Sequence, residues 1–81
     1  MTTVTLYGRP GCHLCEEALE VVRRVQAAHP FALVEIDIET DDELLKRHLE
    51  RIPVIAVDGE QLFEFFVDEI SLVSALQSQA R

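Results

Sequence analysis

The sequence predicts a single α/β domain, residues 1–81, built on a four-stranded mixed sheet with helices on both faces. Three observations support this prediction. Short segments alternate in apolar residues and longer ones repeat them every three or four positions, which gives the order β-α-β-α-β-β-α. The first half has the pattern of a parallel βαβ unit, and an Asp-Gly pair in the second half predicts an antiparallel hairpin. The 81 residues allow one domain and leave no room for a second.

The first half of the chain is predicted to form a strand, a helix and a second strand. Thr3 to Tyr7 alternates in residues that favour strands, and a Gly-Arg-Pro-Gly turn ends it. From Leu14 to Ala28 the apolar residues recur every three or four positions, which predicts an amphipathic helix. His29-Pro30 ends this helix, because the residue before a proline disfavours the α conformation. The segment from Phe31 to Asp37 is the second predicted strand.

Two further helices are predicted from their polar start signals. Thr40 and Glu43 have the spacing of a capping box, which predicts a short helix that continues through Leu49. Asp68 is expected to cap the last helix. The residues of this helix that we expect to face inward are Ile70, Val73 and Leu76.

A hairpin is predicted between these two helices. Pro53 precedes a strand from Val54 to Val57, and Asp58-Gly59 is a strong signal for a two-residue hairpin turn. The segment from Gln61 to Phe66 is expected to return beside that strand. Its aromatic residues are interpreted as part of the core of the sheet, namely Phe63, Phe65 and Phe66.

Composition and charge exclude several classes of protein. Fifteen Asp and Glu face seven Lys and Arg, a net charge of −8, which disfavours binding to nucleic acid. The longest apolar stretch, Ile52 to Val57, has six residues, whereas a membrane span needs about 20. The start of the sequence lacks the pattern of a signal peptide. We therefore expect a cytoplasmic protein, in a compartment that keeps thiols reduced.

Function depends on the only two cysteines, Cys12 and Cys15. Three positions apart, they cannot join distant parts of the chain, so a disulfide-framework fold is excluded. They lie where the first strand leads into the first helix, and a helix N-terminus stabilises a thiolate. Cysteines so placed have pKa values of about 3.5–7.5, against ~8.5 for a free thiol. We expect Cys12, the outer residue, to attack a disulfide and Cys15, one turn further in, to resolve the mixed disulfide.

Two basic residues near the pair each have two interpretations. His13 adds positive charge near the sulfur when it is protonated, or it is simply an exposed residue of the first helical turn. Arg9 holds the thiolate, or it is a solvated arginine in a loop. The neighbouring Glu16 and Glu17 oppose both effects, although carboxylates in a first turn are also ordinary helix stabilisers.

Other interpretations of the cysteine pair have less support. A structural zinc site needs four ligands, and neither His13 nor the His29 and His48 pair has the required spacing. A structural disulfide across so short a loop removes little chain entropy. Two unrelated core thiols are also conceivable, but a Cys-x-x-Cys at the entry of a βαβ unit is typical of thiol–disulfide chemistry.

Three motifs spread along the chain make it resemble the glutaredoxin-like branch of the thioredoxin-fold superfamily. They are the segment 7–15, which holds both cysteines, Arg51-Ile52-Pro53 before the third strand, and Val67-Asp68-Glu69 before the last helix. The resemblance implies a thioredoxin-like fold and a cis Ile52–Pro53 bond beside the nucleophile. It also implies that the Ile52 backbone pairs with an extended substrate. From the residues alone, a trans proline at the first position of a strand is also allowed.

The resemblance implies which residues bind glutathione. The chain also departs from the family pattern at two places. Asp68 matches the acidic position that meets the γ-glutamyl amine of glutathione, and Arg9 matches the basic position before the cysteines. His13-Leu14 replaces the usual Pro-Tyr between the cysteines. Phe65-Phe66 replaces the glycine pair that lets glutathione approach the backbone, which argues against tight binding of glutathione.

We expect a monomeric dithiol oxidoreductase that reduces protein or glutathione mixed disulfides and uses no resident cofactor or metal. Its expected partners are disulfide-containing proteins and an electron donor, either glutathione as co-substrate or a reductase like thioredoxin reductase. The basic Arg9 and Arg51 flank the two motifs, whereas six acidic residues lie between Glu35 and Glu43, so the site suits an anionic thiol. The alternatives are a catalytically weak binding module of the same fold and a carrier of metal or iron–sulfur clusters.

Overall fold

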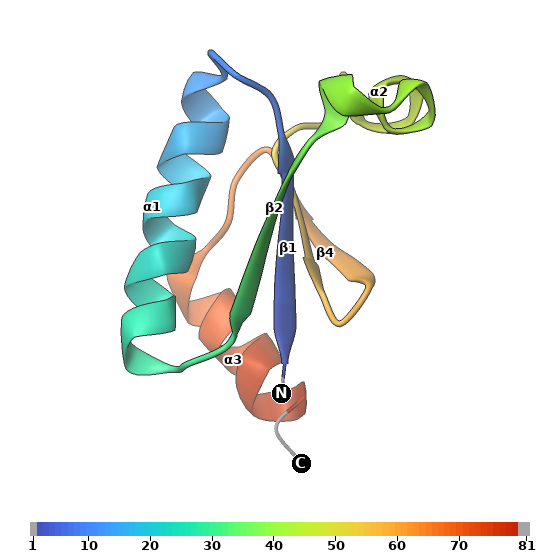
Figure 1. Ribbon diagram of the computed structural model, residues 1–81. Coiled ribbons are helices and arrows are strands. Elements are labelled where there is room, and N and C mark those ends of the chain that lie inside the picture. The colour runs from blue at the N-terminus through green and yellow to red at the C-terminus, as the bar shows by residue number, and fades with distance from the viewer. Residues whose placement is uncertain (1, 80–81) are drawn as a thin grey trace.

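One mixed sheet and three α-helices account for most of the chain (Figure 1). The structure is a computed structural model, and it describes residues 2–79. The order β-α-β-α-β-β-α agrees with the sequence prediction. The element bounds are β1 Thr3–Gly8, α1 His13–Ala28, β2 Ala32–Asp37, the 3₁₀ helix η1 Ile38–Thr40, α2 Asp42–His48, β3 Val54–Val57, β4 Glu60–Glu64 and α3 Glu69–Gln79.

The register of the sheet brings the cysteine motif and the proline motif to the same end of the strands. The strand order is β2-β1-β3-β4, with β1 parallel to β2 and β3 antiparallel to both of its neighbours. Gly8, the last residue of β1, lies opposite Asp37, and Tyr7 lies opposite Val54. The carboxyl end of β1 therefore lies beside the start of β3. The cysteine loop that follows β1 and the proline segment that precedes β3 therefore lie at the same end of the sheet.

Helices cover both faces of the sheet, as predicted. Figure 1 shows α1 and α3 on one side, and α2 on the other side near the end where β1 stops. Alternate residues of β1 point toward α1 and α3, and the outermost strands flank a central pair that is largely buried. The main apolar cluster joins these elements through Val4, Leu6, Val22, Val25, Ile55, Val57, Leu72 and Leu76. No helix within residues 2–79 has the length and apolar composition that a membrane span requires.

The predicted hairpin turn is present between β3 and β4. Asp58 and Gly59 have φ values of 49° and 88°, and positive φ at both central residues is the signature of a type I′ turn. The Asp58 carboxylate accepts a hydrogen bond from the Thr3 amide at 2.9 Å. The Asp58 amide donates to the Thr3 carbonyl at 2.8 Å. The turn is thereby attached to the start of β1.

The predicted start of α2 is wrong by one residue. Asp41, not Thr40, caps the helix, and its carboxylate accepts a hydrogen bond from the Glu43 amide at 2.8 Å. Thr40 ends η1 instead, and its hydroxyl donates to the Asp37 carbonyl at 2.7 Å. Thr40, Asp41 and Asp42 are all suitable caps, so the choice depends on the hydrogen bonds that each makes after folding.

The strand β4 ends at Glu64, two residues earlier than predicted. Phe65 has a φ of 67°, and its amide donates a hydrogen bond to the Pro53 carbonyl at 2.9 Å. This change of backbone direction ends the strand, so the side chains after Glu64 no longer alternate between the two faces of the sheet. Phe63 packs against the core as predicted, but Phe65 and Phe66 are 42% and 71% exposed, so their assignment to the core is wrong.

The buried side of α3 is rotated from the predicted one. Ile70 is 80% exposed, whereas Leu72 is fully buried and Leu76 nearly so. Leu72 and Leu76 are four residues apart and define the buried stripe. Ile70 precedes Leu72 by two residues, about 200° around the helix, and so faces away from the core. The inward position predicted for Leu76 is confirmed, and Val73 is half-buried against the core.

A buried histidine lies on the α2 side of the sheet. His48, the last residue of α2, is 2% exposed, and its ring packs on Tyr7 with centroids 4.8 Å apart. Its Nδ1 atom has no hydrogen-bond partner among the described residues. Burial lowers the pKa of His48 below its usual 6.5, and the neighbouring Arg47 and Arg51 lower it further, while Glu64 acts weakly in the opposite direction. The buried imidazole is therefore neutral at pH 7.

We predict that the protein loses stability between about pH 7.5 and about pH 5.5, because unfolding releases a histidine that binds a proton more readily than the folded one. The stabilising effect is present above the unfolded pKa and declines as the pH falls below it. His48→Phe retains an aromatic ring without the titration, so its free energy of unfolding should change less with pH. Urea unfolding at both pH values measures this, with His13→Gln as the control for removal of an exposed imidazole. An equally steep pH dependence in His48→Phe would contradict the prediction.

Candidate active site

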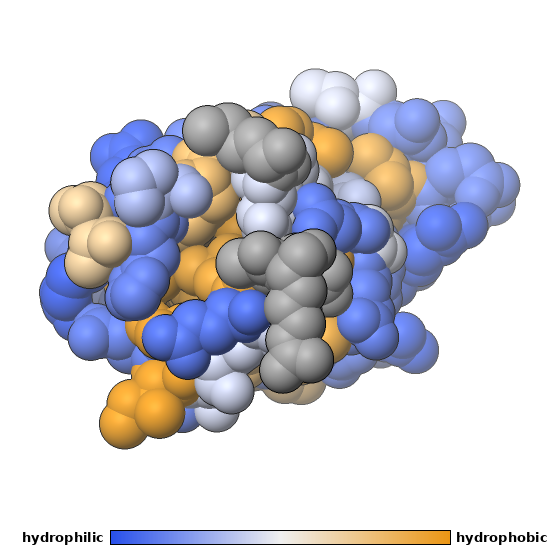
Figure 2. Space-filling model, turned by 90° about the horizontal axis from the view of Figure 1, so that it is seen from below, coloured by the Kyte–Doolittle hydropathy of each residue, from blue (hydrophilic) through white to orange (hydrophobic). Residues whose placement is uncertain are grey.

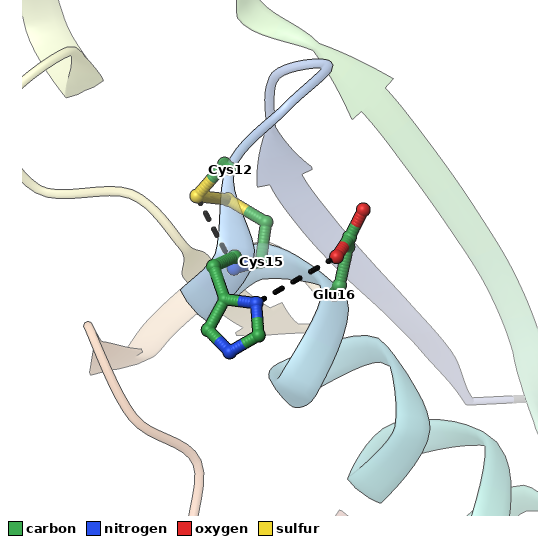
Figure 3. Close-up of a disulfide and its surroundings, with 4 residues drawn as sticks. Cys12, Cys15 and Glu16 are labelled. Atoms are coloured by element: carbon green, nitrogen blue, oxygen red, sulfur yellow. Dashed lines mark hydrogen bonds and ion pairs between the residues drawn. A yellow bond between two sulfur atoms is a disulfide. The ribbon is translucent and has the colours of Figure 1, made fainter.

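The cysteine pair lies at the mouth of α1. Cys12 is the N-cap residue of this helix, with extended backbone angles, and Cys15 lies in the first turn. The two form a disulfide, with their Cα atoms 5.2 Å apart. The Cys15 amide donates to Cys12 Sγ at 3.2 Å, so one of the free amides of the helix N-terminus points at this sulfur (Figure 3). The arrangement places Cys12 Sγ where backbone N–H groups stabilise negative charge.

The two sulfurs differ in their access to solvent. Cys12 is half-buried, whereas Cys15 is 6% exposed and belongs to the buried residues of α1. A partner disulfide therefore reaches Cys12 more easily than Cys15. The attacking role of Cys12 and the resolving role of Cys15 stay predictions, and this difference in exposure is compatible with them.

A glycine makes room for the buried cysteine. A Cβ atom on Gly8 would lie 3.0 Å from Cys15 Sγ and 3.2 Å from Cys15 Cβ, which is too close for comfortable packing. Gly8 is the last residue of β1, so the absence of a side chain there lets the first turn of α1 pack directly on the strand. The sequence marks Gly8 as a turn residue, but its steric role depends on a contact that is visible only in the fold.

The proline segment lies beside the cysteine loop. The Ile52–Pro53 bond is cis, as the family resemblance implies. Pro53 is buried and Ile52 is half-buried. The Pro53 carbonyl accepts a hydrogen bond from the Phe65 amide. Within residues 2–79, the backbone amide and carbonyl of Ile52 make no hydrogen bond. The Ile52 amide and carbonyl are thus available to an extended partner.

The two basic residues near the cysteines pair with carboxylates. Arg9 Nη2 lies 3.3 Å from Glu39 Oε2, so its charge is partly neutralised. The His13 side chain is 83% exposed, and its ring nitrogens lie 3.9 Å from carboxylate oxygens of Glu16 and Glu17. Figure 3 shows the contact with Glu16. Exposure of the ring agrees with the interpretation of His13 as a solvated residue of the first turn.

Asp68 caps α3. Its Oδ2 atom accepts hydrogen bonds from the Ser71 amide at 3.0 Å and the Ser71 hydroxyl at 2.8 Å. Both hydrogen bonds lower the pKa of Asp68 below its usual 3.8, the one from the hydroxyl most strongly. The capping role predicted from the sequence is present, and the carboxylate carries a negative charge at neutral pH.

Two hollows border α1, and the sequence did not predict either of them because their walls come from distant segments. One, of about 320 Å³, lies between the loop after β1, α1 and β2, with Arg9 and Cys15 among its lining residues. The other, of about 190 Å³, lies between α1 and residues 65–67, with Leu14 and Phe66 in its wall. We call the second one the phenylalanine hollow. Within residues 2–79, no group of three or more His, Cys, Asp or Glu side chains is arranged to hold a metal ion.

The fold and the cysteine pair define a class, that of thioredoxin-fold proteins with a Cys-x-x-Cys motif. A mutant thioredoxin from Halobacterium salinarum superimposes with a TM-score of 0.73 and 22% identity, over 99% of this chain and 75% of that chain. At this level of identity the likeness establishes the fold. The thioredoxin-like fold predicted from the sequence is confirmed.

The family follows from the sequence comparisons. Residues 3–77 match the model of the glutaredoxin-like domain (DUF836), so the chain belongs to this family. The glutaredoxin-like protein YDR286C homolog of Dictyostelium discoideum is 30% identical over 84 residues, which cover 96% of this chain and 78% of that protein. The resemblance to glutaredoxin-like proteins is confirmed.

Two solved structures are similar in both sequence and fold. Protein Ne2328 from Nitrosomonas europaea is 30% identical with a TM-score of 0.79, over 91% of this chain and 89% of that chain. Protein XcR50 from X. campestris is 29% identical with a TM-score of 0.77, over 93% of this chain and 96% of that chain. These relatives therefore share nearly the whole domain with this chain.

We predict that Gly8→Ala destabilises the reduced protein by about 1–3 kcal/mol, because the added methyl group overpacks the contact with Cys15. A double-mutant cycle in reducing conditions tests the cause. In a Cys15→Ala background the sulfur is gone, so the same change at Gly8 should cost less. Equal costs in both backgrounds, measured by urea unfolding, would show that the contact with the sulfur does not limit this position.

Proposed function

We propose that the protein is a thiol–disulfide oxidoreductase that reduces protein or glutathione mixed disulfides through the Cys12–Cys15 dithiol. One observation carries this proposal: a half-buried cysteine caps a helix and is bonded to a buried cysteine one turn further in. A pair so close contributes little as a structural crosslink. We place the activity in the cytoplasm, where such a pair is kept reduced between turnovers.

The reaction proceeds through two exchanges. The thiolate of Cys12 attacks a disulfide RS–SR′, the Cys12–SR bond forms as the S–S bond breaks, and R′S⁻ leaves and takes a proton from solvent. The thiolate of Cys15 then attacks Cys12 Sγ, which forms the Cys12–Cys15 disulfide and releases RS⁻, protonated in turn. Two electrons pass from the dithiol to the substrate. Two glutathione molecules, oxidised to glutathione disulfide, or a reductase like thioredoxin reductase return them.

Residues around the pair position the substrate in this proposal. The unengaged backbone of Ile52 hydrogen-bonds an extended substrate chain, and Pro53 holds that backbone beside Cys12. Asp68 binds an amine, and Arg9 and His13 bias the local charge toward the thiolate. The ion pair with Glu39 limits what Arg9 contributes, so the amide that points at Cys12 Sγ supplies the more direct stabilisation.

A second candidate is a binding module that retains the fold with little catalysis. The observation that favours it is Phe65-Phe66, which stands where the family resemblance places a glycine pair. Titration of the Cys12 thiol separates the two candidates. An apparent pKa well below ~8.5 supports the oxidoreductase, and a value near that of a free thiol supports the module. Metal that copurifies with the protein would favour a carrier function instead.

We predict that Cys12→Ser reduces the rate of disulfide reduction to the uncatalysed rate, because it removes the attacking sulfur. Cys15→Ser should retain the first attack and accumulate a mixed disulfide with substrate, because it removes the resolving sulfur. Mass spectrometry detects the adduct, and release of substrate thiol measures the rate. Substantial activity in Cys12→Ser would contradict the assignment of the nucleophile.

A further inference from the structure

Apolar side chains are exposed beside the redox site. Phe65, Phe66 and Ile70 are 42%, 71% and 80% exposed, although most large apolar residues of the chain are buried or half-buried. Figure 2 looks at the end of the molecule opposite to the cysteine loop, where hydrophilic side chains cover most of the surface and a hydrophobic projection stands at one side. Phe65 and Phe66 line one hollow together, and exposed apolar side chains that lie together on a small domain are typical of an interaction site.

The exposed phenylalanines border the phenylalanine hollow. Its volume is about 190 Å³, and Leu14, Ala18 and Val21 of α1 form the wall opposite Phe65 and Phe66. Pockets that bind whole cofactors or drug-sized ligands have volumes of about 300–1,000 Å³. The hollow is smaller than that, and its lining suits a single apolar side chain.

Two lining residues connect the hollow to the cysteine loop and to the proline segment. Leu14, in its wall, is one of the two residues between the cysteines. Phe65 is attached to the proline segment, because its amide donates to the Pro53 carbonyl at 2.9 Å. A segment that pairs with the backbone of Ile52 and presents its disulfide to Cys12 therefore passes next to the hollow.

The backbone at Phe65 points to the same use. Its φ of 67° lies in the left-handed region, which glycine adopts freely and a bulky residue adopts at a cost. Residues held in this way concentrate at sites of function. The chain keeps an aromatic side chain at this position and leaves it 42% exposed, so its contribution to packing is incomplete within the domain alone.

The charges around the hollow are negative. Glu17 is one of its lining residues, with a side chain that is 58% exposed, and Asp68 directly follows Val67 in the opposite wall. The nearby cation Arg24 is engaged by Glu69 at 3.1 Å, and the exposed His13 ring lies 3.9 Å from Glu17 Oε1. A partner with lysine or arginine next to its apolar residue complements these charges, whereas the two carboxylates of glutathione do not.

We propose that the phenylalanine hollow receives one apolar side chain from an extended, disulfide-bonded segment of a protein partner, and that Glu17 and Asp68 select partners with a basic residue beside it. This inference rests on the function proposed above and names its substrate class. The hollow supplies a contact that a glutathione mixed disulfide cannot make. The protein therefore reduces disulfides of apolar, basic protein segments faster than it reduces glutathione mixed disulfides.

The test uses four short peptides, each with one cysteine in a mixed disulfide with 5-thio-2-nitrobenzoate. The cysteine is flanked by leucine or serine, and then by lysine or glutamate, in all combinations. The glutathione mixed disulfide with the same leaving group is the fifth probe. Reduced wild-type protein should release the coloured thiolate from the leucine–lysine peptide about tenfold faster than from the serine–glutamate peptide. High ionic strength should reduce the lysine advantage and spare the leucine advantage.

Matched variants locate the effect. Phe66→Ser should abolish most of the leucine advantage, because it opens the wall of the hollow. Val34→Thr is the control, since Val34 is 41% exposed on β2 at the far edge of the sheet and lies outside the hollow. Glu17→Lys should reverse the preference between lysine and glutamate peptides. Circular dichroism establishes that each variant is folded before its rates are compared.

The outcomes separate this inference from the function on which it rests. If the wild-type protein releases no thiolate from any probe, the proposed oxidoreductase function fails. If it reacts with all five probes at equal rates, the function stands and the docking proposal is overturned. The docking proposal is equally overturned if Phe66→Ser and Val34→Thr lose the same fraction of activity on the leucine peptides.

Discussion

The close contact between Gly8 and Cys15 determines the rest of the site. Because Gly8 has no side chain, the first turn of α1 packs directly against the end of β1, with Cys15 Sγ about 3.0 Å from the position that a Cβ would occupy. The helix start is thereby held in place, and Cys12 is left at its mouth with an amide directed at its sulfur. The difference in exposure between the two cysteines is a consequence of this packing, and the different roles proposed for them rest on it.

The parts of the fold that the sequence predicts well are those with local causes. The strand–helix alternation follows from residue periodicity, and the hairpin follows from Asp58-Gly59, whose residues tolerate positive φ. The place of the cysteines at a helix N-terminus follows from the same periodicity. The cis bond before Pro53 is different, because the residues alone allow either isomer and only the family resemblance indicates the one that the structure has.

The parts that the sequence does not predict depend on contacts between distant segments. Phe65 continues the alternation of β4 in the sequence, yet its amide bonds to Pro53 and the strand ends before it. His48 is buried because the end of α2 packs on the face of the sheet where the ring of Tyr7 lies. No periodicity within one segment contains that information, which explains why the pattern assigns exposed phenylalanines to the core and does not identify a buried histidine.

The ion pairs show how the net charge of −8 bears on the binding of anions near the cysteines. Arg9, which together with Arg51 is expected to attract an anionic thiol, lines the hollow beside β2 and is engaged by Glu39. Against other residues of α1, the phenylalanine hollow combines an apolar wall with the carboxylate of Glu17. Both hollows are therefore less favourable to anions than the positions of the arginines in the sequence suggest. An apolar wall favours apolar side chains, and the nearby carboxylates repel anions. In the docking proposal, these two properties of the hollow make the rate of reduction depend on the residues that adjoin the substrate disulfide.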